Sequence, residues 1–287
     1  MIYWLLPIIL LTQSAVDKPA YQIFDQAGKT IPYDSMIAEL TQADVVLFGE
    51  LHNNALVHWL ELQVAKDLHA QDSNLGVGLE MLEADNQLLV NEYLAGTIEK
   101  RHFTQEAKLW DNYGTDYEPI VDFSKGNNVP VIATNIPRRY ASLVSRQGID
   151  WLDSLADQAK HWIAPLPVEI DTTLPGYQNM LNMMGGNTTH GSMSGEKMVQ
   201  AQAIKDATMA HFIQQNMESG DTFLHINGSY HSDNFEGIYW YLQQQSPSLV
   251  IKTISCVEQT KLDSLLEENQ QVADFIIVTP SDMTKTY

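Results

Sequence analysis

The stretch that decides the fold is Asp44-Val45-Val46-Leu47-Phe48-Gly49, which runs directly into Glu50-Leu51-His52. Its apolar residues are continuous rather than alternating, which is typical of a strand covered on both faces, as in a parallel sheet. Five further runs favour strands, and they lie at 75–81, 129–134, 222–226, 249–257 and 273–278. Segments with helical periodicity separate most of them.

This alternation predicts an α/β fold, a three-layer α/β/α sandwich with a largely parallel, mixed sheet. The segment from Pro165 to Gly195 breaks the alternation with repeated prolines and glycines, so we expect a helical cap insertion within about 140–215. The chain has no internal repeat, low-complexity tract or linker. We therefore expect one domain over residues 16–287.

Composition excludes several classes of protein. The 287 residues are 44% apolar and only 18% charged, which excludes a disordered chain. The 16 Lys and Arg stand against 36 Asp and Glu, so the net charge is −20 and nucleic acid is not an expected partner. The lone Cys256 lies in a strand-like run, where we expect it to be buried, and it excludes an internal disulfide and a four-cysteine zinc site.

The N-terminus predicts export. Ile2 to Leu11 is a short apolar run followed by small and polar residues, as in a signal peptide over 1–15. The alternative is a buried N-terminal strand or helix. No lipobox cysteine is found near the cleavage region, so we expect a protein of the periplasm or the cell surface without a lipid anchor.

Chemically capable side chains follow four of the predicted strands. The set is Glu50 and His52, Glu80, Asn135 with Arg138 and Arg139, and His231. In open α/β sheets, ligands bind beyond the carboxyl ends of the strands, so we expect these groups to share one crevice. Glu50, His52, Glu80 and His231 are the candidate catalytic or metal-binding residues, since carboxylates and imidazoles bind zinc, manganese or cobalt.

Each of these residues also has a structural interpretation. Glu50 and Glu80 are able to cap the following helix or to pair with Arg138. A histidine on an apolar face is usually a hydrogen-bonded core residue, which is the interpretation we favour for His225. His58, on the first crossover helix, is a weaker candidate than His52.

The predicted cap contains side chains that suit haem. Tyr177 and His190 lie there among several methionines, and Tyr, His and Met are axial ligand types for haem iron. The alternative is that methionine fills gaps under an irregular loop. The chain has no c-type attachment motif, so any haem would be bound non-covalently.

An ordered set of motifs resembles the ChaN-like haem-binding uptake family, a part of the Tiki superfamily that also includes metal-dependent proteases and erythromycin-esterase-like hydrolases. The resemblance runs from about Ala43 to Gly237, and its motifs are Gly49-Glu50-Leu51-His52 with His58, Gly78-Leu79-Glu80-Met81, Trp110 with Tyr113 and Tyr117-Glu118-Pro119, Ala133 to Arg138, Ala201-Gln202-Ala203 with Asp206 to Ala210, and Gly228 to His231. It implies an α/β fold, export to the bacterial envelope, and haem held partly by the cap in dimers that stack two haems. It also implies iron ligation by tyrosine, with Tyr177 and His190 as the corresponding residues of this chain.

Three functions remain open from the sequence. The leading hypothesis is a haem-binding protein for haem or iron uptake, with propionates held by Arg138 or Arg139 and with an outer-membrane haem receptor and a second copy of the chain as partners. The alternative is a metal-dependent hydrolase of protease or esterase type. The third is a surface interaction protein with a crevice that binds neither haem nor metal.

Overall fold

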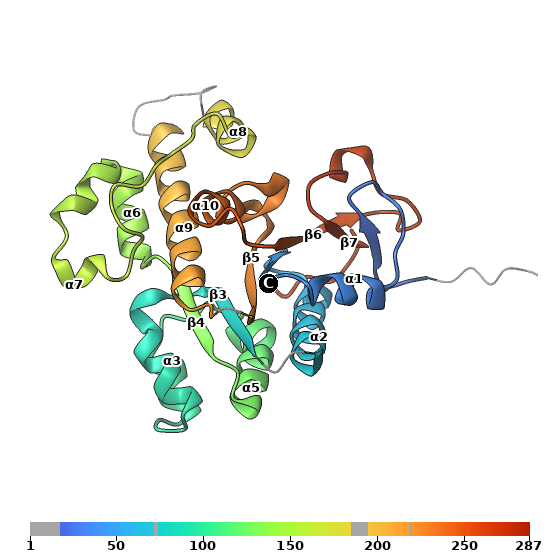
Figure 1. Ribbon diagram of the computed structural model, residues 1–287, viewed down its shortest axis with the longest axis horizontal. Helices are drawn as coiled ribbons and strands as arrows, with labels where there is room; N and C mark the ends of the chain where they lie inside the picture. Colours follow the sequence, from blue (N-terminus) through green and yellow to red (C-terminus); the bar gives the residue numbers. More distant parts are fainter. Residues whose placement is uncertain (1–17, 72–73, 185–194, 219) are drawn as a thin grey trace, which may run out of the picture.

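The computed structural model describes residues 18–71, 74–184, 195–218 and 220–287. It contains one sheet of seven strands in the order β1-β7-β6-β2-β5-β3-β4 (Figure 1). The strands are β1 (Gln22–Asp25), β2 (Val45–Glu50), β3 (Leu75–Glu83), β4 (Val131–Asn135), β5 (Thr222–Gly228), β6 (Ile251–Gln259) and β7 (Phe275–Pro280). β1 pairs antiparallel with β7, and every other neighbouring pair is parallel.

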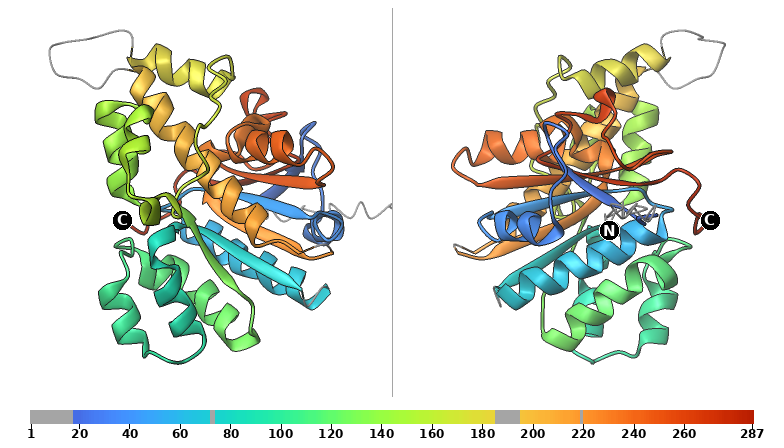
Figure 2. Two further views of the ribbon diagram at one scale, coloured as in Figure 1. Left: turned by 60° about the vertical axis from the view of Figure 1, so that its left-hand side comes forward. Right: turned by 90° about the vertical axis from the view of Figure 1, so that its right-hand side faces the viewer.

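Helices lie on both faces of this sheet (Figure 2). The α-helices are α1 (Tyr33–Leu40), α2 (Ala55–Gln71), α3 (Gln87–Leu94), α4 (Lys100–Glu106), α5 (Glu118–Asn127), α6 (Arg138–Gln147), α7 (Asp157–Lys160), α8 (Pro175–Met184), α9 (Gly195–Gln215) and α10 (Ile238–Gln245). Six shorter helical turns connect them: η1 (Ala84–Asn86), η2 (Tyr113–Tyr117), η3 (Ile149–Ser154), η4 (Ser229–His231), η5 (Asp233–Phe235) and η6 (Glu267–Asn269).

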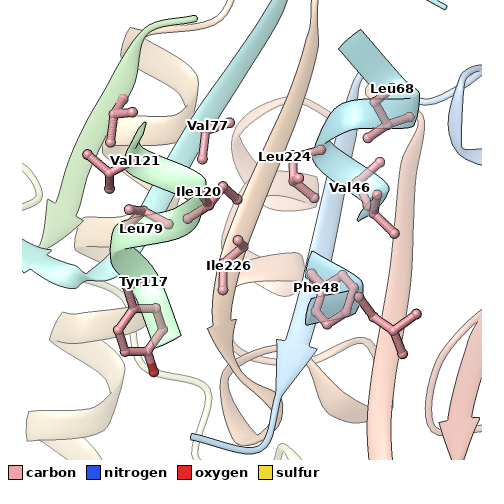
Figure 3. Packing of buried hydrophobic residues seen from close by; sticks show 14 of the residues in the cluster. Val46, Phe48, Leu68, Val77, Leu79, Tyr117, Ile120, Val121, Leu224 and Ile226 are labelled. Carbon is pink, nitrogen blue, oxygen red and sulfur yellow. The ribbon is translucent and has the colours of Figure 1, made fainter. Parts of the chain in front are cut away.

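Two apolar clusters, one on each face, hold the layers together. On one face, Val46 and Phe48 of β2 pack with α1, α2 and α5. Figure 3 shows Leu224 and Ile226 of β5 with Ile120 and Val121 of α5 on one side and Leu68 of α2 on the other. On the other face, Val45 and Leu47 pack against α6, α9 and α10. Successive residues of β2 thus point to opposite faces and all of them are buried, which explains the continuous apolar run in the sequence.

The predicted fold class is confirmed. All six predicted strands are present, although β4, β6 and β7 begin two residues later than expected, and β1 adds a seventh, antiparallel strand at the edge. Cys256 and His225 are buried as expected. No helix among the described residues is both long and apolar enough to span a bilayer. The predicted signal segment 1–15 and His190 lie outside the described residues.

The strand order explains how the candidate site forms. β5 lies between β2 and β3, and Glu50 at the end of β2 is in register with Gly228 at the end of β5. Because the three strands are parallel, their carboxyl ends meet at one edge of the sheet. The side chains of Glu50, His52, Glu80 and His231 are therefore brought to that edge.

Candidate functional site

A hollow of about 1140 Å³ lies at the carboxyl edge of the sheet. Its walls come from the ends of β3 and β4, the segments that follow β2 and β5, the start of α6, the middle of α9, the 108–112 segment and the C-terminal Tyr287. Figure 2 shows the C-terminus between α6 and α3. The lining residues are His52, Glu80, Glu83, Lys108, Leu109, Trp110, Asp111, Asn112, Asn135, Ile136, Arg138, Arg139, Ala141, Ser142, Lys205, His231 and Tyr287.

Glu50 and His52 form the first carboxylate–imidazole pair of the site. His52 Nδ1 lies 2.6 Å from Glu50 Oε1, which also accepts a hydrogen bond of 2.8 Å from Tyr117 Oη. Burial alone raises the pKa of Glu50, but hydrogen bonds to His52 and His58 outweigh it and lower the pKa to about 2. Glu50 is therefore a carboxylate, and it orients the partly exposed His52 ring toward the hollow.

Glu80 and His231 form the second pair. His231 Nε2 lies 3.1 Å from Glu80 Oε1, and Nδ1 lies 2.5 Å from Oδ1 of the buried Asp206. Burial disfavours the imidazolium, but the charges of Glu80 and Asp206 outweigh it and raise the pKa of His231 to about 10. His231 is thus a cation at neutral pH, held between two carboxylates.

The two pairs meet over the backbone of Gly228. A Cβ atom at this position would lie 2.8 Å from His52 Nε2 and 3.7 Å from Glu80 Oε2, and the Gly228 amide donates to Glu80 Oε2 at 2.7 Å. Only a residue without a side chain permits the His52 ring to approach this closely. Two acid–base groups therefore share one wall of the hollow.

Tyr177 of α8 contacts the second pair through Asp206. Its hydroxyl donates to Asp206 Oδ2 at 2.9 Å, and the ring is buried. Burial, together with the nearby charge of Asp206, raises the pKa of Tyr177 well above its ordinary value. Tyr177 does not line the hollow. It is connected to the hollow only indirectly, through hydrogen bonds from Tyr177 to Asp206 and between Asp206 and His231.

The hollow also carries four cationic side chains, Lys108, Arg138, Arg139 and Lys205. Arg139 pairs with Asp85 at 2.5 Å and lies over the rings of Tyr140 and Trp162, and Lys108 pairs with Glu83 and Asp85. Arg138 and Lys205 form no ion pair or hydrogen bond with any residue that the structure describes. These two cations are available to an anionic ligand.

The structure brings most of the predicted residues together. His52, Glu80, His231, Arg138 and Arg139 line the same hollow, and Glu50 lies directly behind His52. The alternative that Arg138 pairs with Glu50 or Glu80 is wrong, because histidines occupy both carboxylates.

Several residues of the site were not among the predicted site residues, although the motifs of the family resemblance include Tyr117 and Asp206. Asp206 and Lys205 lie on α9, and Tyr117 and Asn112 come from the η2 region. Glu61, on α2, lies beside His58 and Glu50. A usable signal was the spacing of His58 and Glu61, because residues three apart on a helix face the same side.

Comparisons with solved structures place this architecture. ChaN of Campylobacter jejuni, in a structure that describes cofacial heme binding, has a TM-score of 0.70 and 21% identity, with 91% of this chain and 97% of that chain covered. A succinoglycan biosynthesis protein has a TM-score of 0.50 and 10% identity over 87% of this chain and 91% of that chain. At these identities the likeness concerns the fold alone. No curated protein sequence matches the chain.

The sequence comparison with family models is more specific. The model described as haem-binding uptake, Tiki superfamily, ChaN matches residues 36–242. This span includes both carboxylate–imidazole pairs, Asp206 and the four cations of the hollow. Because the match covers well over half of the chain, the protein belongs to the ChaN family of haem-binding uptake proteins in the Tiki superfamily.

Proposed function

We propose that this protein binds haem non-covalently in the hollow at the carboxyl edge of the sheet and serves haem or iron uptake. Membership of the ChaN family carries the proposal. The hollow supports it, since about 1140 Å³ exceeds the volume of most small-molecule sites, roughly 300–1,000 Å³. Bound haem supplies a redox-active iron, and the chain supplies the groups that hold it.

The residues present fit the propionates of haem. Arg138 and Lys205 line the hollow without an ion-pair partner among the described residues, and a guanidinium or an ammonium binds a carboxylate well. Arg139, the other predicted cation, already pairs with Asp85. We therefore propose that Arg138 and Lys205 bind the propionates, while the Arg139–Asp85 ion pair holds the side of the hollow in place.

Tyr177 and His190 of the cap remain the proposed iron ligands. A phenolate is a hard anionic ligand that suits ferric haem. Tyr177 donates its hydrogen to Asp206 in this structure, so ligation requires the phenol to leave Asp206 and α8 to shift. Tyr177→Phe should then weaken ferric haem binding without removing the hollow.

Titration with haemin tests this function. We expect a shift of the Soret band at one haem per chain, with weaker binding in Tyr177→Phe and His190→Ala. Arg139→Ala is the matched control for Arg138→Ala, since both residues start α6 but Arg139 already pairs with Asp85, whereas Arg138 has no such partner among the described residues. A wild-type protein that causes no Soret shift would refute the proposal.

We further propose that residues 1–15 direct export to the periplasm or the cell surface, and that two copies of the chain associate around haem delivered by an outer-membrane receptor. Support for export comes from the apolar run of the N-terminus. Cell fractionation, and sedimentation of the protein with and without haemin, test the two claims. Retention in the cytoplasm, or a monomer under both conditions, would exclude them.

A second candidate function is a hydrolase. The observation that favours it is the pair of imidazoles on one wall, each held by a buried carboxylate. Although burial opposes it, Glu50 raises the pKa of His52 and orients its ring, so that His52, once it has lost its proton, is able to accept a proton from water at Nε2. The positive charge of His231 lies beside Glu80 and is able to stabilise negative charge that develops nearby. Ester and peptide hydrolysis that is lost in both His52→Gln and His231→Gln would support it.

A further inference from the structure

A second polar cluster lies beneath the hollow, inside the layer between the sheet and α2. It consists of Glu50 at the end of β2 and of His58 and Glu61 on α2, all buried. His58 Nδ1 lies 3.1 Å from Glu50 Oε2 and 3.2 Å from Glu61 Oε2. The three ligand atoms all lie within 4.8 Å of one another, and the cluster alone meets this condition among the residues that the structure describes.

We propose that Glu50, His58 and Glu61 form a binding site for one divalent transition-metal ion, separate from the haem hollow. Once His58 Nδ1 and both carboxyl groups have released their protons to bind a metal, the cluster carries a charge of −2, which a divalent ion neutralises inside the protein. A buried charge that lacks such compensation is costly. Nitrogen and carboxylate oxygen together suit zinc, manganese or cobalt rather than a soft ion.

The distances in the cluster suit a metal. With metal–ligand bonds of about 2.0–2.1 Å, the ligand atoms of a tetrahedral site lie about 3.3 Å apart. The observed separations of 3.1 and 3.2 Å around His58 Nδ1 are close to that value. Small rotations of the two carboxylates would therefore bring all three atoms to one ion.

Outer contacts already fix the orientation of the ligands. His58 Nε2 lies 3.1 Å from the carbonyl oxygen of His52, an acceptor, so Nε2 carries the hydrogen and Nδ1 faces the two carboxylates. Tyr117 and His52 both contact Glu50 Oε1, which leaves Oε2 for the ion. Such support of the ligand side chains is typical of metal sites in proteins.

An unpartnered oxygen atom provides a second and independent observation. Glu61 Oε1 is buried and has no hydrogen-bond partner among the described residues, and Glu50 Oε2 has only the 3.1 Å contact with His58 Nδ1. Buried acceptors are almost always hydrogen-bonded, and an exception calls for a specific explanation, such as an ion. An ion between Glu50, His58 and Glu61 would satisfy these groups.

Metal titration of the full-length protein tests the proposal. After treatment with a chelator, we expect the protein to bind one equivalent of Zn²⁺, Mn²⁺ or Co²⁺, and at least tenfold weaker binding in His58→Gln and in Glu61→Gln. His231→Gln is the matched control, because it removes an imidazole of the hollow and leaves this cluster intact. Circular dichroism confirms that each variant is folded.

X-ray absorption of the zinc-loaded wild type gives a readout that needs no variant. The proposed site supplies one histidine nitrogen, whereas a site in the hollow would use His52 and His231 and supply two. Three results would each overturn the proposal. The first is a spectrum with two histidine ligands, the second is metal that is lost in His231→Gln but kept in His58→Gln, and the third is a wild-type protein that binds no metal.

Discussion

His231 is the residue whose charge state depends most directly on its neighbours. It is buried between Glu80 and Asp206, and its pKa is raised to about 10, whereas histidine in an unfolded chain titrates near 6.5. A raised pKa in the folded state adds stability that is complete below about pH 6.5 and is lost as the pH rises toward about 10. At high pH, two buried carboxylates would then face each other without the cation between them.

We therefore expect His231→Gln to lose about 3 kcal/mol of unfolding free energy near pH 6, the cost of breaking a buried ion pair. The difference from wild type should shrink between about pH 6.5 and 10. Urea unfolding at several pH values measures it. His211→Gln is the control, because burial lowers the pKa of His211 and the ring is neutral across this range. A difference that stays constant with pH would show that His231 is neutral.

Gly228 limits how closely His52 approaches the sheet. A Cβ atom there would lie 2.8 Å from two atoms of the His52 ring, so Gly228→Ala must displace that ring. We expect a loss of about 1–3 kcal/mol in unfolding free energy, as for other overpacked sites, and a changed His52 signal in the NMR spectrum.

The matched control for Gly228→Ala is Gly126→Ala. A Cβ atom at Gly126, in α5, would meet nothing within 4 Å. That substitution should stabilise the protein by about 0.5–1 kcal/mol through helix propensity. Equal effects of the two substitutions would contradict a steric role for Gly228.

For single residues, the sequence predicts where a site residue lies in the fold better than it predicts which residues it contacts. Glu50, His52, Glu80 and His231 were identifiable because each lies near or just after the carboxyl end of a predicted strand. Their hydrogen-bond partners were not, since Asp206 and Glu61 lie on helices whose rotation depends on packing against the sheet. Arg138 was expected to be able to pair with Glu50 or Glu80, and the histidines occupy those carboxylates instead.

Among the elements, α8 is attached to the rest of the molecule at its first turn. Gly176 N donates to Glu236 Oε2 at 2.7 Å, Tyr230 Oη donates to the Gly176 carbonyl at 2.7 Å, and Tyr177 donates to Asp206. The first two contacts come from the segment after β5. The position of α8 is thus fixed by the loop that carries His231.

Tyr177→Phe removes one of these three contacts and leaves Asp206 without a hydroxyl donor. A hydrogen bond to a charged group contributes about 1.5–3 kcal/mol, so we expect the variant to lose that much unfolding free energy. Amide exchange in α8 should become faster than in the wild type, whereas exchange in α10 should change less. Tyr239→Phe is the control, because its hydroxyl makes no hydrogen bond to a described residue. Unchanged exchange in α8 would mean that Glu236 and Tyr230 hold the helix alone.

The elements differ in how well their sequences predict them. β2 and β5 are buried on both faces, so unbroken apolar runs identify them. α8 has no such signature, because it packs through Tyr177, Met180 and Leu181 against a small cluster on α9. Its contacts depend on the preceding loop, and loop conformation is not encoded in periodicity.

In the molecule as a whole, the hollow gathers positively charged side chains although the net charge of the chain is negative. The chain carries a net charge of −20, yet Arg138 and Lys205 lie in the hollow without an ion-pair partner in the part of the chain that the structure describes. At about 0.15 M salt the Debye length is about 8 Å, so the distant acidic surface is largely screened while cations in contact with a ligand are not. Local attraction should therefore dominate the binding of an anion such as haem.

Haemin and its dimethyl ester separate this local attraction from the rest of the binding energy, since the ester lacks both propionate charges. Each partly exposed ion pair contributes up to about 1 kcal/mol, so the ester should bind about tenfold more weakly to the wild type at 0.15 M salt. In a double variant, Arg138→Ala with Lys205→Ala, the two ligands should bind alike, whereas Arg139→Ala should keep the preference, because Arg139 is already paired with Asp85. Competitive titration measures the ratio. A double variant that still prefers haemin would mean that the propionates bind elsewhere on the molecule. An ester that binds the wild type as tightly as haemin would mean that the affinity comes from the iron and the porphyrin ring and not from the cations of the hollow.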